Sequence, residues 1–374
     1  MMKTLYIHIG TPKTGSSAIQ AFLSQNREVL TQKGFCYPKF PFHYDYVSKN
    51  RNGYFLRAKK LENRQSDFEE GIEMLRKAFE EYSNVILSEE GIWYENFKWH
   101  QQLFDVMQEK GYQVKIIVYL RRQDDYVVSR WNQFVKSYSY KYKHRDTDDG
   151  IWENFLKREL KDSRLNYFTT LKKLEDIYGE GNILVRRYDR NYFTKGSVIS
   201  DFLQTVGLER TDEYTEAQLV VNPSLSPNTA EIQRVLNTVV AERDEENVND
   251  ASDIKFLRDR LLSYSVLSKE SYPCNMFSED EAKEFMEHYH KENCRVAKKY
   301  FGEEELFSLE IKAVPKWEKD NPNMQDDIIR FMGLTFMYFL EENREIRKEL
   351  HTLKLFRKKI RHPIRTIEEK MSNR

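Results

Sequence analysis

The chain has 374 residues, and its 60 lysines and arginines balance its 60 aspartates and glutamates. This length suits about two domains, and the hydrophobic content of 40% excludes a wholly disordered chain. Because the formal net charge is zero, we exclude a protein that binds nucleic acid through an overall positive field, and any anionic ligand must be met by a local cluster.

The cysteines and the lengths of the apolar runs predict the cellular compartment and the relation of the chain to membranes. Cys36, Cys274 and Cys294 are few and scattered, which suits neither a disulfide scaffold nor a zinc site. We therefore expect a cytoplasmic protein with no metal. The longest apolar runs, 116–120 and 331–340, are shorter than the roughly 20 residues of a spanning helix, so we expect no transmembrane segment.

Strand and helix patterns alternate over the first 210 residues. The short apolar runs that predict strands lie at 4–9, 84–87, 114–120 and 182–188. A turn at 10–15 leads from the first of these into a helical pattern at 17–30. Nearly continuous apolar runs separated by helices are typical of a parallel sheet that helices cover on both faces.

The remainder of the chain reads as mostly helical. We expect an α/β core at 1–210, a mainly helical part at 211–314 that completes the same domain and its acceptor cleft, and a C-terminal helix at 323–374. In that helix, a spacing of three and four residues over about four heptads predicts a coiled-coil seam, formed by Ile329, Met332, Phe336, Phe339, Asn343, Ile346, Leu350, Leu353, Arg357 and Ile360.

Two interpretations of the C-terminal helix stay open. It is either a long helix packed on its own domain, or a helix that joins two copies, with Asn343 fixing the register. The tail at 347–374 is rich in lysine and arginine. It is either a solvated surface or a contact for a membrane surface or an anionic polymer.

A glycine-rich turn between the first strand and the first helix predicts a phosphate site. Backbone N–H groups at a helix start attract anions, and Gly15 permits a close approach. Gly10 and Gly15 have the spacing of the ATP-binding P-loop, but Ser16 stands where that loop has lysine. The lysine of this turn is Lys13, two residues before Gly15, and this position argues against an ATP-dependent kinase or ATPase, which is the second hypothesis.

The segment 12–17 resembles the 5′-phosphosulfate loop of sulfotransferases that use 3′-phosphoadenosine-5′-phosphosulfate (PAPS). The resemblance implies a P-loop-like three-layer α/β fold with a central parallel sheet. It also implies PAPS as co-substrate, and Lys13 as the catalytic contact to the bridging oxygen of the leaving group. The residues that would bind the nucleotide here are Pro12, Lys13, Thr14, Gly15, Ser16 and Ser17.

A second motif strengthens the resemblance. The family places an arginine after a buried strand and a serine eight residues later, and together they hold the 3′-phosphate. Arg121 follows the strand at 114–120, and Ser129 lies eight residues further on. Arg122 is a competitor for the arginine role. A weaker match, at the end of the strand at 182–188, makes Tyr188 a candidate for a position near the adenine.

Sulfuryl transfer to a hydroxyl needs a base for the acceptor proton. Glu89 and Glu90 follow the strand at 84–87, at the sheet edge where parallel strands place ligands. We favour Glu89 over Glu90, and His8 in the first strand is the rival. Glycan-modifying members of the resembled family often use glutamate here, which favours a carbohydrate acceptor.

Residues 131–145 combine aromatic side chains with lysine and arginine. Within this stretch, 136–145 contain four lysines and arginines and no acidic residue. This pattern suits an acceptor groove for a sugar that carries negative charge, but it also suits a plain helix surface. A third hypothesis for the whole chain is a catalytically silent sulfotransferase-like scaffold that its C-terminal helix oligomerises.

Overall fold

The computed structural model describes residues 3–45, 47–61, 63–137, 150–216, 224–243, 251–271, 273–311 and 313–372. The chain forms two compact units. The first unit comprises Met1–Phe134, Gly150–Asn222 and Met276–Val314, and the second comprises Val135–Asp149, Pro223–Asn275 and Pro315–Arg374. Residues of the predicted 211–314 segment are thus divided between the two units. Among the described residues, no helix is long and apolar enough to cross a membrane.

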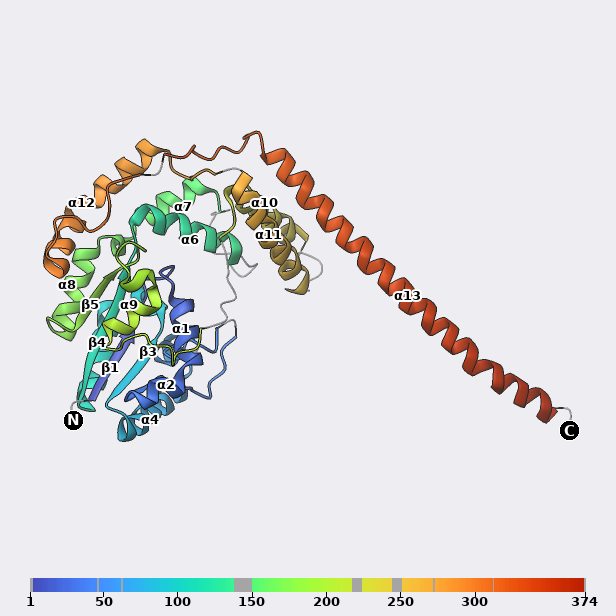
Figure 1. Cartoon of the computed structure of the whole chain (residues 1–374), viewed down its shortest axis with the longest axis horizontal. Coiled ribbons are helices and arrows are strands. Elements are labelled where there is room, and N and C mark those ends of the chain that lie inside the picture. The colour runs from blue at the N-terminus through green and yellow to red at the C-terminus, as the bar shows by residue number, and fades with distance from the viewer. Residues whose placement is uncertain are drawn as a thin grey trace. The chain divides into compact units, whose positions relative to one another are not determined.

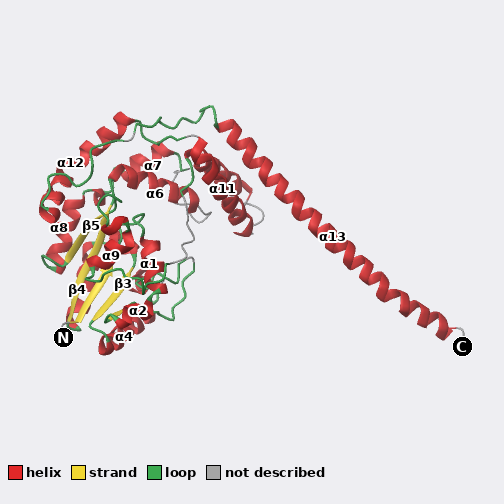
Figure 2. Cartoon of the chain, viewed as in Figure 1, coloured by secondary structure: helices red, strands yellow, loops and turns green. Residues whose placement is uncertain are grey.

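A five-stranded parallel sheet forms the centre of the first unit (Figures 1 and 2). Its strand order is β2-β3-β1-β4-β5, with bounds β1 (Lys3–His8), β2 (Phe35–Cys36), β3 (Asn84–Ser88), β4 (Tyr112–Leu120) and β5 (Ile183–Arg187). In register, Ile7 of β1 lies between Leu87 of β3 and Ile116 of β4. Because all strands are parallel, their carboxyl ends meet at one edge, where ligands bind in such sheets.

Helices cover both faces of the sheet. The helices of the first unit are α1 (Ser16–Gln25), α2 (Arg27–Gln32), α3 (Phe55–Leu61), α4 (Gln65–Glu81), α5 (Phe97–Glu109), α6 (Gln123–Ser137), whose last residues belong to the second unit, α7 (Trp152–Glu159), α8 (Tyr167–Tyr178), α9 (Val198–Thr205) and α12 (Glu279–Phe301). Short 3₁₀ turns are η1 (Glu90–Tyr94), η3 (Ser163–Leu165) and η4 (Thr194–Gly196). This arrangement confirms the predicted α/β fold with a central parallel sheet.

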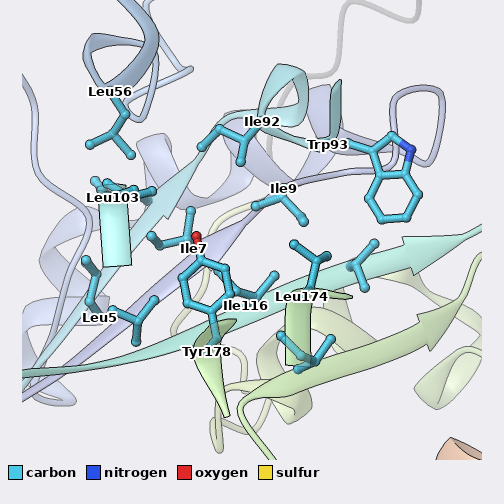
Figure 3. Close-up of a cluster of buried hydrophobic side chains, with 14 of the residues drawn as sticks. Leu5, Ile7, Ile9, Leu56, Ile92, Trp93, Leu103, Ile116, Leu174 and Tyr178 are labelled. Carbon is cyan, nitrogen blue, oxygen red and sulfur yellow. The ribbon is translucent and has the colours of Figure 1, made fainter. Parts of the chain in front are cut away.

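Side chains alternate between the two faces, as the strand period of two requires. Leu5 and Ile7 point to one face and pack with Leu103 of α5 and Leu174 of α8 (Figure 3). Tyr6 points to the other face, where the cluster contains residues of α1 and α9. Two buried apolar layers therefore hold the strands rigidly beneath the turn that follows β1.

The second unit consists of helices in the described part of the chain. Its elements are α10 (Pro227–Arg243), α11 (Ala251–Ser271) and the 49-residue α13 (Met324–Ser372). The start of α13 packs against α10 and α11, where Tyr264 and Asn228 donate hydrogen bonds of 2.7 Å and 2.6 Å to the Asp327 carboxylate. The predicted long C-terminal helix is present.

Two local details differ from the sequence-based elements. The predicted helix at 17–30 is two helices, because Asn26 leaves the helical path and its amide donates to the carbonyl oxygens of Phe22 and Thr215, at 2.9 Å each. The two-residue strand β2 was not predicted, since its pairing with β3 is too short to produce an alternating pattern.

Candidate functional site

Hydrogen bonds to β4 and within the turn fix the backbone of the turn that follows β1. The Thr11 N–H and hydroxyl both donate to the Tyr119 carbonyl oxygen of β4, at 3.0 Å each, and the Thr14 hydroxyl donates to the Thr11 carbonyl oxygen at 2.5 Å. Lys13 has a φ of 68° and Gly15 a φ of 74°, a left-handed conformation that is uncommon outside glycine. This path wraps the turn around the start of α1.

Polar groups at the start of α1 lack partners among the residues that the structure describes. Gly15 occupies the N-cap position, so no side chain caps the first N–H groups of the helix. The Ser16 side chain is 2% exposed, and its hydroxyl oxygen is buried without a hydrogen-bond partner. A buried hydroxyl without a partner is costly. Together with the helix dipole, it fits a bound anion such as a phosphate.

Lys13 points its ammonium group toward α6. Its Nζ donates to the Gln133 side-chain oxygen at 3.2 Å, while its backbone carbonyl accepts a 3.0 Å hydrogen bond from the Arg121 guanidinium. Burial lowers the pKa of Lys13, the charge of Glu90 opposes this shift, and the charges of Arg121 and Arg130 add to it. Three cationic groups, those of Lys13, Arg121 and Arg130, therefore lie near this turn, where an anion would offset their mutual repulsion.

Arg121 and Tyr188 complete one side of the turn. The Arg121 guanidinium lies 5.7 Å from the centre of the Tyr188 ring, within the range of a cation–π contact. That ring lies against the backbone of Gly15, where a Cβ atom would be only 3.1 Å from Tyr188 Cε2. Tyr188 follows β5, and Arg121 follows β4. The structure thus brings both predicted nucleotide-binding residues to the turn.

The remaining predicted residues of the nucleotide motif occupy distinct places. Ser129 is buried on α6, and because Gln133 is four residues further on, the two side chains share a helix face, the face that meets Lys13. The competitor Arg122 is directed elsewhere: it donates to the carbonyl oxygens of Ser308 and Glu310 and lines a separate pocket of about 270 Å³. Of the two arginines, Arg121 alone contacts the turn among the described residues.

Buried Thr14 and Pro12 form the interior of the turn, whereas Ser17 is exposed on α1. Ser17 nevertheless lies in the first turn of the helix, so its backbone N–H is one of the groups that helix geometry leaves without a carbonyl partner.

Glu89 is a fully buried carboxylate enclosed by two arginines. Its side chain is 0% exposed. Arg51 donates to it at 2.9 Å and 2.5 Å, and Arg57 donates at 3.2 Å. The Gly91 N–H adds a fourth hydrogen bond at 2.9 Å. A Cβ atom on Gly91 would collide with the Arg57 guanidinium and with Glu89 Oε1, so a larger residue there would displace this ion pair. All four bonds hold Glu89 in place.

Glu90 is the carboxylate that faces the turn. It begins η1 and is half-buried, and a Cβ atom on Gly10 would lie 3.2 Å from Glu90 Cβ. Its charge acts on both Lys13 and Arg51. Within the described part of the chain, no hydrogen bond or ion pair holds this carboxylate. Glu90 thus lies close to the turn, with its carboxylate oxygens unoccupied by hydrogen bonds from the described residues.

His8 is enclosed in the core at the end of β1. It is 0% exposed, and its Nδ1 lies 2.8 Å from the Ser88 hydroxyl oxygen. The rings of Tyr119 and Phe202 meet it edge-on. Burial lowers its pKa to about 3, so the imidazole is neutral at pH 7. The structure places this ring away from solvent.

Sequence reasoning missed Gln133, the partner of Lys13, and the two arginines that hold Glu89. Gln133 lies within the aromatic and basic stretch at 131–145, but no feature of the sequence marks it. Arg51 and Arg57 stand 38 and 32 residues before Glu89 in the chain, in a stretch without a motif. Most of the predicted acceptor segment, residues 138–145, lies outside the described residues.

Comparisons with known proteins yield distant relatives. No family model matches the chain. A protein of Archaeoglobus fulgidus described as uncharacterized is 28% identical over 227 residues, which cover 61% of this chain and 57% of that protein. The chain thus matches little more than half the length of this relative.

Similar solved structures are sulfotransferases. The sulfotransferase from Alicyclobacillus acidocaldarius is 14% identical, with a TM-score of 0.38, over 68% of this chain and 100% of that one. The sulfotransferase domain from the curacin biosynthetic pathway is 12% identical, with a TM-score of 0.32, over 72% of this chain and 98% of that one.

Proposed function

We propose that this protein is a sulfotransferase that moves the sulfuryl group of PAPS to a hydroxyl acceptor. The observation that supports this most is the buried, unpartnered hydroxyl of Ser16 at an uncapped helix start, beside Lys13 and Arg121. This donor set suits a nucleotide with several phosphate groups, and the turn lacks the lysine that an ATP-binding loop carries after its second glycine.

Each side chain has a role in this proposal. The loop N–H groups and hydroxyls of 12–17 bind the 5′-phosphosulfate, and Arg121 with Ser129 binds the 3′-phosphate. The Tyr188 ring borders the adenine side. A guanidinium fork is well suited to phosphate oxygens. Because Arg121 already donates to the backbone of the turn, a bound 3′-phosphate would link the two halves of the site.

The proposed reaction is an in-line transfer. The acceptor oxygen forms a bond to sulfur as the bond between sulfur and the bridging phosphate oxygen breaks, and 3′,5′-ADP leaves with the bonding electrons. Lys13 stabilises the negative charge that develops on the bridging oxygen. The acceptor proton passes to a carboxylate. We assign this step to Glu90 in preference to Glu89, because the Glu89 carboxylate already accepts four hydrogen bonds.

The affinity for 3′,5′-ADP tests the nucleotide assignment. Calorimetry should show that the wild-type chain binds 3′,5′-ADP at least tenfold more tightly than 5′-AMP. Arg121→Ala should remove most of that preference, since a hydrogen bond to a charged group contributes about 1.5–3 kcal/mol. Arg122→Ala is the matched control and should retain it. Equal affinity for the two nucleotides refutes the proposal, and Mg²⁺-dependent binding of ATP would favour the kinase alternative.

The acceptor in this proposal is a carbohydrate, such as a polysaccharide or a glycolipid. Support comes from the glutamate at the proposed base position and from the basic, aromatic composition of residues 131–145, because aromatic faces and cations suit anionic sugars. Incubation of the protein with PAPS carrying ³⁵S and a panel of glycans, phenols and steroids tests this. Label that enters phenols alone would refute the carbohydrate assignment without affecting the transferase proposal.

We extend the proposal to location and assembly. Cys36, Cys274 and Cys294 are all free thiols, which supports a reducing, cytoplasmic compartment.

Two copies associate through the exposed seam of α13, and the basic tail beyond it meets an anionic surface. The mass of the protein in solution tests the association, since one chain has a mass of 45.0 kDa.

A further inference from the structure

Residues 341–357 of α13 are not covered by any described part of the chain. Near its start the helix packs on one side, where Phe331 and Thr335 are buried and Tyr338 meets Phe256 of α11. From 341 to 357, by contrast, every residue is exposed. A helix without tertiary contacts is marginally stable in water, so this segment needs a partner.

Apolar residues at heptad positions a and d form one seam along this helix, and Ile328, Leu334, Met337, Leu340, Leu355 and Phe356 are exposed apolar residues outside it. The seam residues recur at alternating intervals of three and four residues, and they are largely exposed: Ile329 61%, Met332 43%, Phe336 60%, Phe339 43%, Ile346 53%, Leu350 50% and Leu353 59%. Two helices that both carry an apolar seam with a 3.5-residue period can pack along their length as a coiled coil. A second copy of this chain offers such a helix.

The charges that flank the seam define the direction of that second helix. Glu342 and Glu349 occupy the g positions, and Arg347 and Lys354 occupy the e positions of the following heptads. In a parallel, in-register pair, each g residue meets the e residue five positions later on the other helix. Glu342 then faces the Arg347 of the other copy, and Glu349 faces its Lys354, so both of these pairs are attractive, whereas Arg357 at an a position meets the Arg357 of the other copy.

An antiparallel pair would bring like charges together. In that arrangement g residues face g residues and e residues face e residues, so glutamate meets glutamate and cation meets cation. A parallel pair also places Asn343 of each copy in the same a-position layer, where two amides hydrogen-bond to each other and fix the register. We infer that two copies of this chain associate through α13 as a parallel, in-register, two-stranded coiled coil. This inference rests on the association proposed above.

Disulfide trapping tests the orientation. With Leu353→Cys, mild oxidation of the full chain should trap most of the protein as a covalent dimer, because the two d-position thiols lie at the same level of a parallel pair. Thr352→Cys, one residue away and off the seam, is the matched control and should give little dimer above wild type. In an antiparallel pair centred on Asn343, the Leu353 positions lie about 30 Å apart and no disulfide forms.

Light scattering with charge variants distinguishes a chain that does not associate from one that associates in another arrangement. Wild type should have twice the mass of one chain, and Leu350→Asp should be monomeric while Thr352→Asp is not. Glu349→Lys should weaken association by about 3- to 30-fold, and the double swap with Lys354→Glu should restore it. A monomeric wild type, including one that binds anionic phospholipid vesicles, overturns the association. A dimer without the Leu353→Cys disulfide, or a trimer, overturns only the parallel, two-stranded arrangement, and neither result bears on sulfuryl transfer.

Discussion

Replacement of Glu89 by glutamine distinguishes a structural carboxylate from a catalytic base. The glutamine keeps the shape of the side chain and loses its charge. If the new NH₂ group takes the place of Oε2, one hydrogen bond from Arg51 is lost, and if it takes the place of Oε1, the bonds from Arg51, Arg57 and Gly91 are all lost. The first orientation is the less costly, and it still leaves Arg51 without the counter-charge of its ion pair, while Arg57 keeps its 2.8 Å ion pair with Glu95.

The magnitude follows from the burial of this cluster. Arg51 and Arg57 side chains are 22% and 14% exposed, so water compensates little for the lost charge. Removal of one member of a buried pair costs about 3–5 kcal/mol, and for a domain of this size each kcal/mol lowers the melting temperature by about 2–4 °C. We therefore expect Glu89→Gln to lower the melting temperature by roughly 6–20 °C.

Thermal unfolding and sulfuryl transfer are measured together on this variant and on Glu90→Gln. The Glu90 variant should keep its melting temperature within about 2 °C, because no described residue forms a hydrogen bond or ion pair with this carboxylate and substitutions away from specific partners change stability little, and it should lose transfer activity by about 10²- to 10⁴-fold. The reverse pattern, a Glu89 variant that is stable but inactive beside an active Glu90 variant, would refute the assignment of the two roles.

Three further changes test other parts of the site. Ser16→Ala should leave the unliganded protein as stable as wild type or slightly more so, because no described residue bonds to its hydroxyl, yet it should weaken 3′,5′-ADP binding by roughly tenfold or more. A loss of stability without a loss of affinity contradicts the anion site. Lys13→Ala should reduce transfer by about 10²- to 10³-fold. Because burial lowers the pKa of Lys13, wild-type activity should decline with rising pH earlier than an ordinary lysine would allow, whereas Lys13→Arg should show no such decline; identical alkaline profiles would count against the role of this ammonium. His8 has its pKa lowered from 6.5 to about 3, so the unfolded chain binds more protons in this window and stability should fall as pH decreases from about 6.5 toward 3. In urea unfolding, His8→Gln should reduce that pH slope by up to one proton, and an unchanged slope would show that the imidazole is not held neutral.

The sequence was informative wherever local pattern determines structure. Apolar runs located four strands, and the strand-turn-helix order located the turn at 10–15, because both depend on neighbouring residues. The Arg121 and Ser129 spacing located a second element at the same sheet edge. Asn26, however, breaks a helix through bonds to a segment that contains Thr215, and no local pattern contains that information.

The carboxylates show the same limit more clearly. Adjacent glutamates after a strand identify the correct edge of the sheet, but they do not show which one is paired. That depends on Arg51 and Arg57, which approach through a loop and a helix that carry no motif. Long-range pairing of this kind is decided by tertiary packing, and the same holds for the contact between Lys13 and Gln133.

If two copies pair through α13 as proposed, protein concentration controls the local folding of the exposed stretch at 341–357. A helix that gains its stability from a second chain is coupled to that chain by mass action, so dilution favours unwinding of the tail while the sheet of the first unit, with its own buried layers, keeps its structure. The tail should therefore be cut by proteases far more readily in dilute than in concentrated samples. In a cell, the concentration of the protein would then set the fraction of chains in which the basic tail extends from a folded helix.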